Sequence, residues 1–522
     1  MVASKGMPSG KPYSMKGFWA LIATQFQGAF NDNLFQFLIQ FTILGVLIGP
    51  GKTADESTAT MVTAVSTIIF SLPFLVFPGV AGALSDRYSK QFIAVCVKVW
   101  EIFIVCFGFF AFYLESPAFL WVMLFFMATH SAFFSPAKYG ILPEILEESQ
   151  LSWGNGVLQM WTIIAIIAGT GAAGPLHSAL GGKTYLATFV LLFLSCAGLV
   201  MAQYISKPPA ANPAQPIRLN PMQGMIEHFR IMKKDRWLLY TVVGYTYFWF
   251  AGALLRANVF AYGAANLHLS ETQISAVLAA LAVGIGVGAL AAGYLSRQKI
   301  ELGLVPMGVL GIALFSGLLA MPDMSFWTCL ILLFGLGCAS GVFDVPLAAT
   351  LQQRSPNHIK GGIMATTNML TFVGMLGAGA LYWALTRAGV NTRQVFMLNA
   401  VFSLAVGLYM CWRLPILVIR FLLWLVTNTV YRVSVIGRPN FPITGGGLLV
   451  ANHTSYIDPI MLQAVVDRPI RFLMYRGYYE MKWMRPIARI MNAIPVSAAD
   501  SPAELRRSLK EAADTIKNGE LV

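Results

Sequence analysis

Long apolar stretches alternate with short polar connections over most of the chain. Twelve stretches before residue 414 are predominantly apolar, and each holds the roughly 20 residues that a helix needs to cross the hydrocarbon core of a membrane. They cover residues 18–49, 60–84, 92–114, 118–136, 153–176, 183–204, 237–263, 271–296, 301–320, 325–347, 360–386 and 394–413. The pattern predicts an all-α membrane protein with twelve spanning helices.

Lysine and arginine collect in alternate loops. They precede the first stretch and follow the second, fourth, sixth, eighth and tenth, whereas Lys183, Arg387 and Arg393 are exceptions in the other loops. Cytoplasmic loops carry an excess of these cations. We therefore expect both termini to be cytoplasmic.

The composition agrees with a membrane location. The 522 residues are 57% hydrophobic and 11% charged, against about 25% charged in soluble domains, which excludes a soluble enzyme. The formal charge of +13 is better explained by cytoplasmic loops and contacts with anionic lipids than by nucleic acid, because no basic stripe interleaved with aromatics is present.

The connection 206–236 is rich in proline and then basic, and it divides the stretches six and six. Gly82-Ala-Leu-Ser-Asp-Arg87 after the second stretch is echoed by Gly293-Tyr-Leu-Ser-Arg297 after the eighth. We predict two parallel repeats, residues 1–205 and 237–413, joined by a cytoplasmic linker.

Gly82-Ala-Leu-Ser-Asp86-Arg87-Tyr-Ser-Lys-Gln resembles the loop signature of the major facilitator superfamily, although Ser89 and Gln91 depart from it. A small Gly82 permits close helix approach. Asp86 could pair with a cation or a helix N-terminus in one conformation only, so that Gly82, Asp86 and Arg87 form a conformational latch. The alternative is a tight turn with ordinary interfacial charges.

The first stretch carries more polar residues than a lipid-facing helix tolerates: Gln25, Gln27, Asn31, Asp32, Asn33, Gln36 and Gln40. An Asp at the centre of a membrane helix costs about 2.5–3.5 kcal/mol, so Asp32 needs a partner. Arg256 in the seventh stretch lies at a similar height. We predict that an Asp32–Arg256 pair closes an outer gate and that Asn31 and Gln36 belong to the same site. Arg256 could also bind a substrate phosphate. The alternative to a gate is a permanent ion pair that only holds the two halves together.

Other polar residues in the stretches are weaker candidates. Asp344 in the tenth stretch is a candidate cavity residue, with a solvated position near a loop as the alternative. Five further polar residues lie in the stretches: Asn155, Gln159, Tyr245, Tyr247 and Asn368. Each could line a cavity or form a hydrogen bond between packed helices, and the sequence is equally compatible with both roles.

Two strings, Phe26-Gln-Gly-Ala-Phe-Asn-Asp-Asn33 and Ser131-Ala-Phe-Phe-Ser-Pro-Ala-Lys-Tyr-Gly-Ile-Leu-Pro-Glu144, resemble those of the lysophospholipid transporter family. The resemblance implies movement of lysophosphatidylethanolamine and lysophosphatidylglycerol from the outer to the inner leaflet of a bacterial inner membrane.

A short apolar segment at 414–431, flanked by arginines, predicts an interfacial helix on the cytoplasmic leaflet; a buried helix of the following domain is the alternative. Residues 432–522 contain an apolar strand that ends in Asn-His453-Thr-Ser-Tyr-Ile-Asp458, which resembles motif I of the glycerolipid acyltransferases. His453 is then the general base and Asp458 orients its imidazole. The alternative is a chance match to a short pattern.

The resemblance to acyltransferases is partial. The second motif lacks its usual arginine, and the strand leading to the family's phosphate-binding motif is the last feature of the sequence, so we expect an incomplete and inactive α/β acyltransferase domain. From Ser501 to Gly519 the sequence predicts a capped helix with Leu505, Leu509 and Ile516 on one face.

These features predict a transporter coupled to phospholipid repair, with an acylated acyl carrier protein as acyl donor, membrane lipids as surroundings, and no cofactor or metal. Two rivals remain. One is a proton-coupled exporter of amphipathic drugs, and the other is an acyltransferase on an anchor that does not transport.

Overall fold

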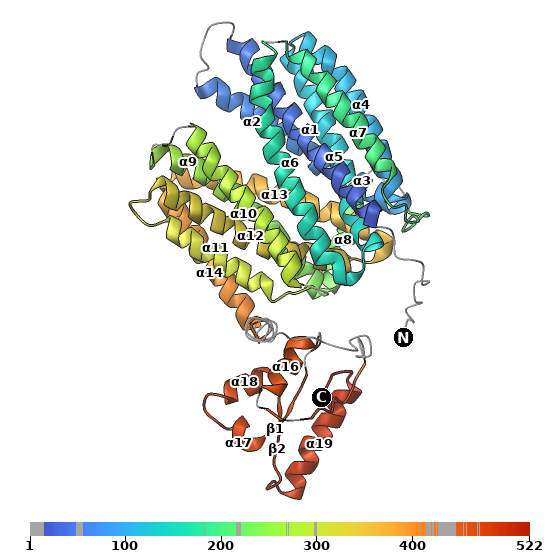
Figure 1. Ribbon diagram of the computed structural model, residues 1–522, viewed down its shortest axis with the longest axis vertical. Coiled ribbons are helices and arrows are strands. Elements are labelled where there is room, and N and C mark those ends of the chain that lie inside the picture. The colour runs from blue at the N-terminus through green and yellow to red at the C-terminus, as the bar shows by residue number, and fades with distance from the viewer. Residues whose placement is uncertain are drawn as a thin grey trace. The chain divides into compact units, whose positions relative to one another are not determined.

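The structure is a computed structural model (Figure 1). It describes residues 15–48, 56–181, 183–215, 221–267, 269, 271–296, 300–413, 419, 422–423, 425, 445–452, 454–455, 457–466, 468 and 470–522. These residues belong to two compact units, Met1–Ile300 with Gly308–Leu404 and Glu301–Met307 with Ala405–Val522. Each unit is described by itself.

Long helices account for nearly all of the described chain before residue 414. The first half contains α1 (Met15–Ile48), α2 (Glu56–Val76), α3 (Pro78–Arg87), α4 (Lys90–Tyr113), α5 (Pro117–Ile145), α6 (Leu151–Ala179) and α7 (Ala187–Gln203). The second half contains α9 (Arg236–Ala265), α10 (Glu271–Ser296), α11 (Leu304–Leu319), α12 (Phe326–Arg354), α13 (Lys360–Arg387) and α14 (Thr392–Arg413). Short 3-10 turns precede α6, α7 and α13.

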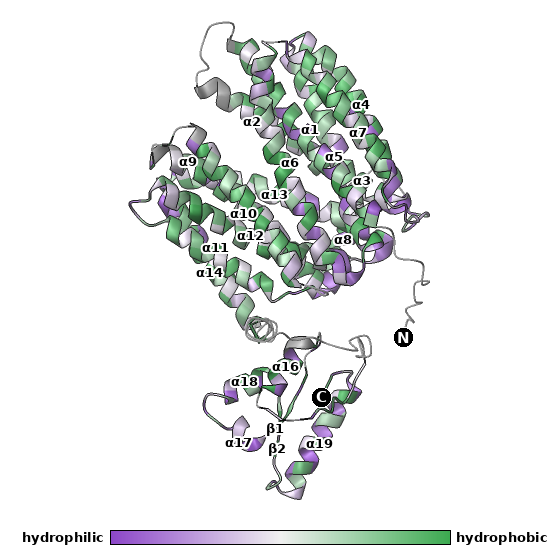
Figure 2. Ribbon diagram, viewed as in Figure 1, coloured by the Kyte–Doolittle hydropathy of each residue, from purple (hydrophilic) through white to green (hydrophobic). Residues whose placement is uncertain are grey.

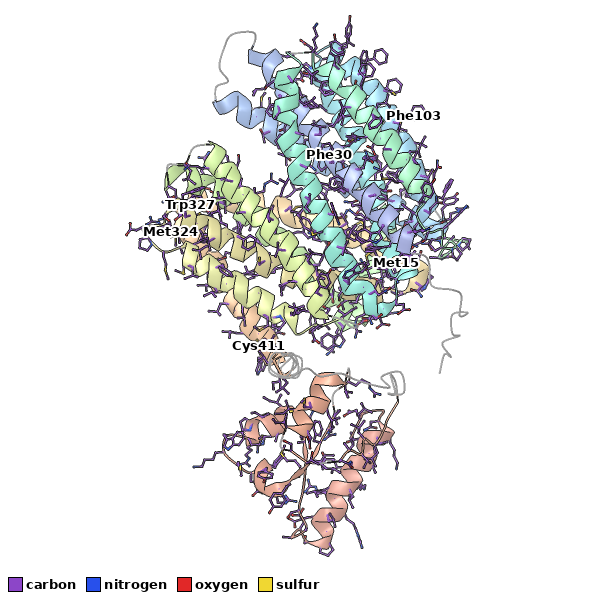
Figure 3. All side chains as sticks on the ribbon, in the orientation of Figure 1. Met15, Phe30, Phe103, Met324, Trp327 and Cys411 are labelled. Carbon is purple, nitrogen blue, oxygen red and sulfur yellow. The ribbon has the colours of Figure 1, made fainter. Side chains whose placement is uncertain are left out.

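Apolar residues cover these helices along most of their length, and polar residues gather near their ends (Figure 2). Phe103 and Trp327 extend outward from the helices (Figure 3) and are 61% and 69% exposed. Nine helices in the described part of the chain are long and apolar enough to cross a membrane, and α2 with α3 would make a tenth. The chain is therefore a multi-pass membrane protein, because lipid is the surrounding that such a surface favours.

The second predicted stretch is broken. The axes of the two helices differ by 51° where α2 ends and α3 begins at Pro78. A proline has no backbone N–H to donate, and its ring clashes with the preceding turn, which accounts for the break at this residue.

The connection between the halves contains a helix that the sequence analysis did not predict. This helix, α8 (Pro221–Lys234), packs against α3, α9 and α13. His228 lies in α8, and its Nδ1 atom is 2.8 Å from the hydroxyl of Thr366 in α13. The linker thus packs against α3, which carries the loop motif Gly82–Arg87, and against α13.

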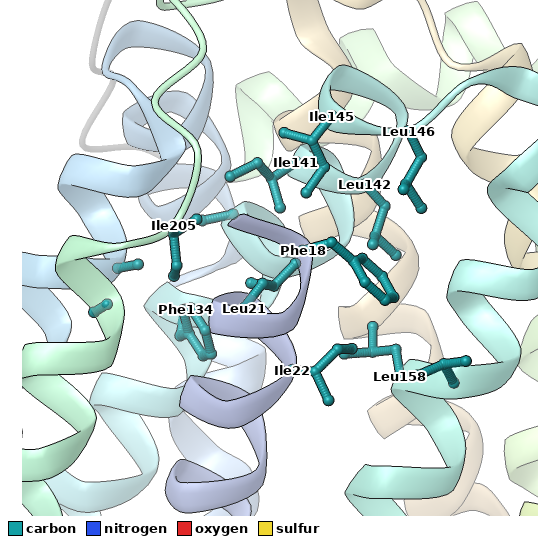
Figure 4. Close-up of a cluster of buried hydrophobic side chains, with 14 of the residues drawn as sticks. Phe18, Leu21, Ile22, Phe134, Ile141, Leu142, Ile145, Leu146, Leu158 and Ile205 are labelled. Atoms are coloured by element: carbon teal, nitrogen blue, oxygen red, sulfur yellow. The ribbon is translucent and has the colours of Figure 1, made fainter. Parts of the chain in front are cut away.

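The first half is held together by apolar packing. One cluster joins Phe18, Leu21 and Ile22 of α1 to Phe134 and Ile141 of α5 (Figure 4). These side chains are less than one-tenth exposed. They fix α1 against α5, the two helices that carry the polar residues described below.

The second unit contains α16 (Asp458–Val465), β1 (Leu473–Tyr475), α17 (Arg476–Tyr479), α18 (Arg485–Ile490), β2 (Ile494–Val496) and α19 (Pro502–Lys517). Strands β1 and β2 pair in parallel, with Leu473 opposite Ile494. The backbone of Gly447 and Leu449 pairs with residues 520–522. This is a small α/β arrangement. The predicted helix at 414–431 lies outside the described residues apart from four isolated positions.

The predicted capped helix is present as α19. Ser501 and Glu504 form the reciprocal capping box, and Gly519 has a positive φ of 84° just after the helix. The three residues predicted on one face differ in burial, because Leu505 and Leu509 are exposed whereas Ile516 is half-buried. The buried side of α19 consists of Ser508, Ala512 and Thr515. Ser508 donates a hydrogen bond from this side to the carbonyl of Pro495.

Candidate functional site

Asp32 lies in the middle of α1, beside α5. Its Oδ2 atom accepts a hydrogen bond of 2.5 Å from the hydroxyl of Ser131, and its Oδ1 atom is 3.8 Å from Nδ1 of His130. The Asp32 side chain is 13% exposed. Oδ1 has no hydrogen bond within the described part of the protein.

Behind Asp32, a buried ion pair on α4 forms the centre of a polar cluster. Nζ of Lys98 donates to Oε2 of Glu101 over 2.7 Å, and both side chains are 0% exposed. Lys98 also donates to Oε1 of Gln27 over 2.7 Å. Since the two residues are three positions apart, one face of α4 presents both charges to the interior.

Glu101 is fully supplied with donors. Its Oε1 atom accepts hydrogen bonds of 2.8, 2.8 and 2.9 Å from Gln27, Asn31 and Ser195. Its Oε2 atom faces Lys98 and, at 3.4 Å, Nε2 of His130. A buried carboxylate with this many donors is stabilised in its charged form.

These contacts make a continuous chain of four charged or titratable groups from Lys98 through Glu101 and His130 to Asp32, which we call the buried charge network. Helices α1, α4 and α5 supply the four groups, α7 supplies Ser195 as a donor to Glu101, and these helices pack together (Figure 1). The sequence analysis missed Lys98, Glu101 and His130. The signal was a Lys and a Glu three residues apart within an apolar stretch.

The predicted Asp32–Arg256 pair is not formed in this structure. Asp32 instead contacts Ser131 and His130. Arg256 lies in α9, its side chain is exposed, and the described residues include no salt-bridge partner for it. Asn31 donates a hydrogen bond to Glu101 of the network. Gln36 is half-buried in α1, and no described contact joins it to the network.

Asp344 is buried in α12 and is 3% exposed. The alternative of a solvated position is therefore wrong. Its Oδ1 atom has no hydrogen-bond partner among the described residues. Tyr139 of α5 and Tyr245 of α9 lie within electrostatic range, so this carboxyl group is close to both halves of the first unit.

The loop motif joins the two halves. The Asp86 carboxylate, which is fully buried, accepts hydrogen bonds from the backbone N–H groups of Gly361 and Gly362, over 2.6 and 2.9 Å. These residues begin α13, where the helix dipole and free N–H groups favour an anion. A Cβ atom added to Gly82 would lie 2.7 Å from Cα of Gly362, so only glycine permits this approach. Arg87 contacts the ring of Tyr88 at 5.8 Å.

Two further contacts between the halves lie at the same end of the helices. The side-chain amides of Asn155 and Gln352 exchange two hydrogen bonds of 2.8 Å. Gly156 lies against the backbone of Ala289. We call this end, which includes Asp86, Asn155 and Gln352, the sealed end. Lys90 forms an ion pair with Glu144 there, within the first half.

In the second unit, Asp458 is the first residue of α16. Its Oδ2 atom accepts hydrogen bonds from the backbone N–H groups of Thr454 and Ser455, over 2.7 and 2.8 Å. This geometry fixes the carboxylate beside the loop that contains His453. His453 itself lies outside the described residues. Groups of three or more potential metal ligands are absent from the described part of the chain.

Sequence comparison identifies two regions. The Major Facilitator Superfamily profile matches residues 33–379, and the Acyltransferase profile matches residues 432–522. The lysophospholipid transporter LplT of Klebsiella pneumoniae subsp. pneumoniae is 29% identical over 406 residues, or 76% of this chain and 96% of the relative. LplT of Serratia proteamaculans is 30% identical over 384 residues, or 72% of this chain and 90% of the relative.

Structural comparison indicates the same fold. The E. coli fucose:proton symporter FucP superposes with a TM-score of 0.61 at 14% identity, covering 76% of this chain and 98% of FucP. A human organic anion transporter superposes with a TM-score of 0.59 at 13% identity, covering 77% and 99%.

Proposed function

Because the chain belongs to the Major Facilitator Superfamily and is related to lysophospholipid transporters, we propose that it moves lysophospholipids from the outer to the inner leaflet of a bacterial inner membrane. Lysophosphatidylethanolamine and lysophosphatidylglycerol are the proposed substrates. The observation that carries the proposal is the buried charge network, because charges in a membrane interior are costly and are retained where they serve transport.

We propose that α1 and α11 also cross the membrane, which completes twelve spans in two parallel sets of six. Both termini and the sealed end then face the cytoplasm, as the cation-rich loops favour. Asp86 and the start of α13 hold the cytoplasmic side closed, so the present conformation is the one that receives lipid from the outer side.

Inward movement requires the opposite arrangement, in which the outer side closes and the sealed end opens. Arg256 then moves to Asp32 and the Asp86 contacts break. A carboxylate and a guanidinium form a strong charge-assisted pair away from water, so this pair can replace the free energy lost at the sealed end. In the open state, Arg256 is available to the substrate phosphate.

We further propose that residues 432–522, which we expect to be inactive without the family's phosphate-binding motif, contribute the general base and its orienting carboxylate to an acyltransferase that acts on the imported lipid. His453 takes the proton from the glycerol 2-hydroxyl, and the oxygen attacks the thioester carbonyl of an acyl carrier protein. His453 then returns the proton to the departing thiolate, while Asp458 stabilises the imidazolium. Fusion keeps both activities on one chain and raises their effective concentration.

Uptake of labelled lysophosphatidylethanolamine by spheroplasts tests the proposal. Asp32→Ala and Arg256→Ala should each reduce uptake at least about tenfold, because loss of one pair worth about 1.4 kcal/mol changes a rate by that factor. Lys183→Ala is the matched control, since Lys183 is an exposed cation in the connection between α6 and α7 and lies outside the proposed gate. Unchanged uptake in both variants would exclude the gate, and no uptake by the parent would exclude the importer.

A proton-coupled drug exporter is the second candidate, because the network also contains a histidine within reach of a carboxylate. An exporter removes amphipathic cations from spheroplasts and does not accumulate lysolipid. The third candidate, an acyltransferase on an anchor that does not transport, is disfavoured because an anchor needs no charged residues inside the membrane.

A further inference from the structure

His130 has an unusual surrounding for an imidazole. Its Nε2 atom faces Oε2 of Glu101 at 3.4 Å, and its Nδ1 atom faces the carbonyl oxygen of Met127 at 2.5 Å and Oδ1 of Asp32 at 3.8 Å. The hydroxyl of Ser131 lies 3.4 Å from Nδ1 but already donates to Asp32. Both ring nitrogens therefore face oxygen acceptors.

A neutral imidazole carries one N–H group and one lone pair, whereas an imidazolium carries two N–H groups. In this surrounding, the neutral form would direct a lone pair at an oxygen atom. The protonated form satisfies both sides of the ring. The geometry therefore favours a proton on each nitrogen of His130 in this conformation.

The charge balance leads to the same conclusion. Asp32 from α1 and Lys98 and Glu101 from α4 are the described groups that act electrostatically on His130. With His130 protonated, two positive charges balance two negative charges. Lys138, further along α5 and half-buried, acts on Asp32 over a longer range. A buried cluster with zero net charge is less costly than one with an unbalanced charge.

We propose that the His130 proton and Arg256 are alternative partners of Asp32, so that closing the outer gate releases one proton. The inference rests on the gate that the proposed function contains. When Arg256 reaches Asp32 it adds a positive charge to the network, and loss of the His130 proton restores the balance. The chain is then a proton-binding protein, and its outer gate closes more readily as the pH rises.

Spin-label distances measure the gate without requiring a substrate. Labels on Lys183→Cys and Ala388→Cys, both at exposed positions, report the separation of the halves in the full chain, with the six native cysteines replaced by serine. Release of one proton predicts that the ratio of closed to open molecules rises by up to about tenfold per pH unit, over the pH range in which the open state holds the His130 proton and the closed state has lost it.

His130→Gln removes the titrating group and should abolish the pH response. Arg256→Gln removes the competing cation at an exposed position, where folding is not at risk, and should abolish it as well. His177→Gln is the control, because His177 of α6 contacts Thr184 and Phe41 and not the network, and its response should match that of the parent.

A pH-independent distance in the parent, or a retained response in Arg256→Gln or His130→Gln, would overturn the inference. A lysolipid uptake assay on the same proteins is independent of this result. Absence of uptake with a normal pH response would refute the proposed substrate and leave the proton site standing.

Discussion

Asp86 provides a quantitative test of the sealed end. Its carboxylate accepts two backbone hydrogen bonds, 2.6 Å from Gly361 and 2.9 Å from Gly362, and is fully buried. Hydrogen bonds to a charged group contribute about 1.5–3 kcal/mol each, and a neutral one about 1 kcal/mol. Asp86→Asn keeps one neutral acceptor, so it should weaken the sealed state by at least about 2 kcal/mol.

That loss corresponds to an increase of roughly 30-fold in the population that is open at this end. Maleimide labelling can measure it. Ser85 is fully buried and lies against Gly361, so Ser85→Cys in a background free of other cysteines should react only when the halves separate. The labelling rate should rise about 30-fold in Asp86→Asn, because it follows the open population when opening is fast.

Asp235→Asn is the matched control. Asp235 also caps a helix, accepting hydrogen bonds from the N–H groups of Trp237 and Leu238. Its partner Arg354 belongs to the same half, so its loss should leave the labelling rate unchanged. Equal rates in the parent and in Asp86→Asn, within about threefold, would refute the reasoning, since that ratio equals only about 0.65 kcal/mol.

Three further predictions concern stability. Glu101→Gln leaves Lys98 without its buried counter-charge and should lower the free energy of unfolding by about 3–5 kcal/mol, measured as a lower melting temperature in detergent. The double variant Lys98→Met with Glu101→Leu removes both charges and should be more stable than Glu101→Gln. The opposite order of stability would contradict the charge argument. Burial lowers the pKa of the His228 imidazole, although Glu227 acts in the other direction. Docking of α8 is therefore fully stable above the ordinary histidine pKa of about 6.5 and weakens as the pH falls towards the lowered value; trypsin should cut after Lys233 faster at low pH in the parent, with a smaller change in His228→Phe. Ser501→Ala should destabilise α19 by about 1 kcal/mol, measured by hydrogen exchange of its first turn, and unchanged exchange would exclude a role for the capping box.

The helical part of the fold followed closely from hydropathy, because twenty apolar residues in lipid have few alternatives to a helix. The break at Pro78 was not predicted. Pro78 lies inside the predicted stretch 60–84, and hydropathy alone does not distinguish a proline that breaks a helix from other residues of the stretch. Helix α8 was missed because the linker is short and polar, and its position depends on the surfaces of α3 and α13.

The site was predicted less completely. The sequence shows that a charge such as Asp32 needs a partner, but not which helix supplies it. Arg256 was chosen because it lies at a similar height, whereas the structure places Ser131 and His130 beside Asp32. Ser131 is the first residue of the second string that gave the resemblance, and His130 directly precedes it. The sequence therefore contained both partners of Asp32 but did not show that they are in contact. The contact of Asp86 with the start of α13 likewise joins residues 275 positions apart.

Reconstituted vesicles provide the most direct test of transport of lysolipid by this chain. Purified full-length protein should move labelled lysophosphatidylethanolamine across the bilayer, and the same label on a diacyl phosphatidylethanolamine should not move. Asp32→Asn should reduce the initial rate at least about tenfold, with Lys183→Ala as the control. Movement of amphipathic cations without lysolipid, or equal rates in the parent and Asp32→Asn, would contradict the account.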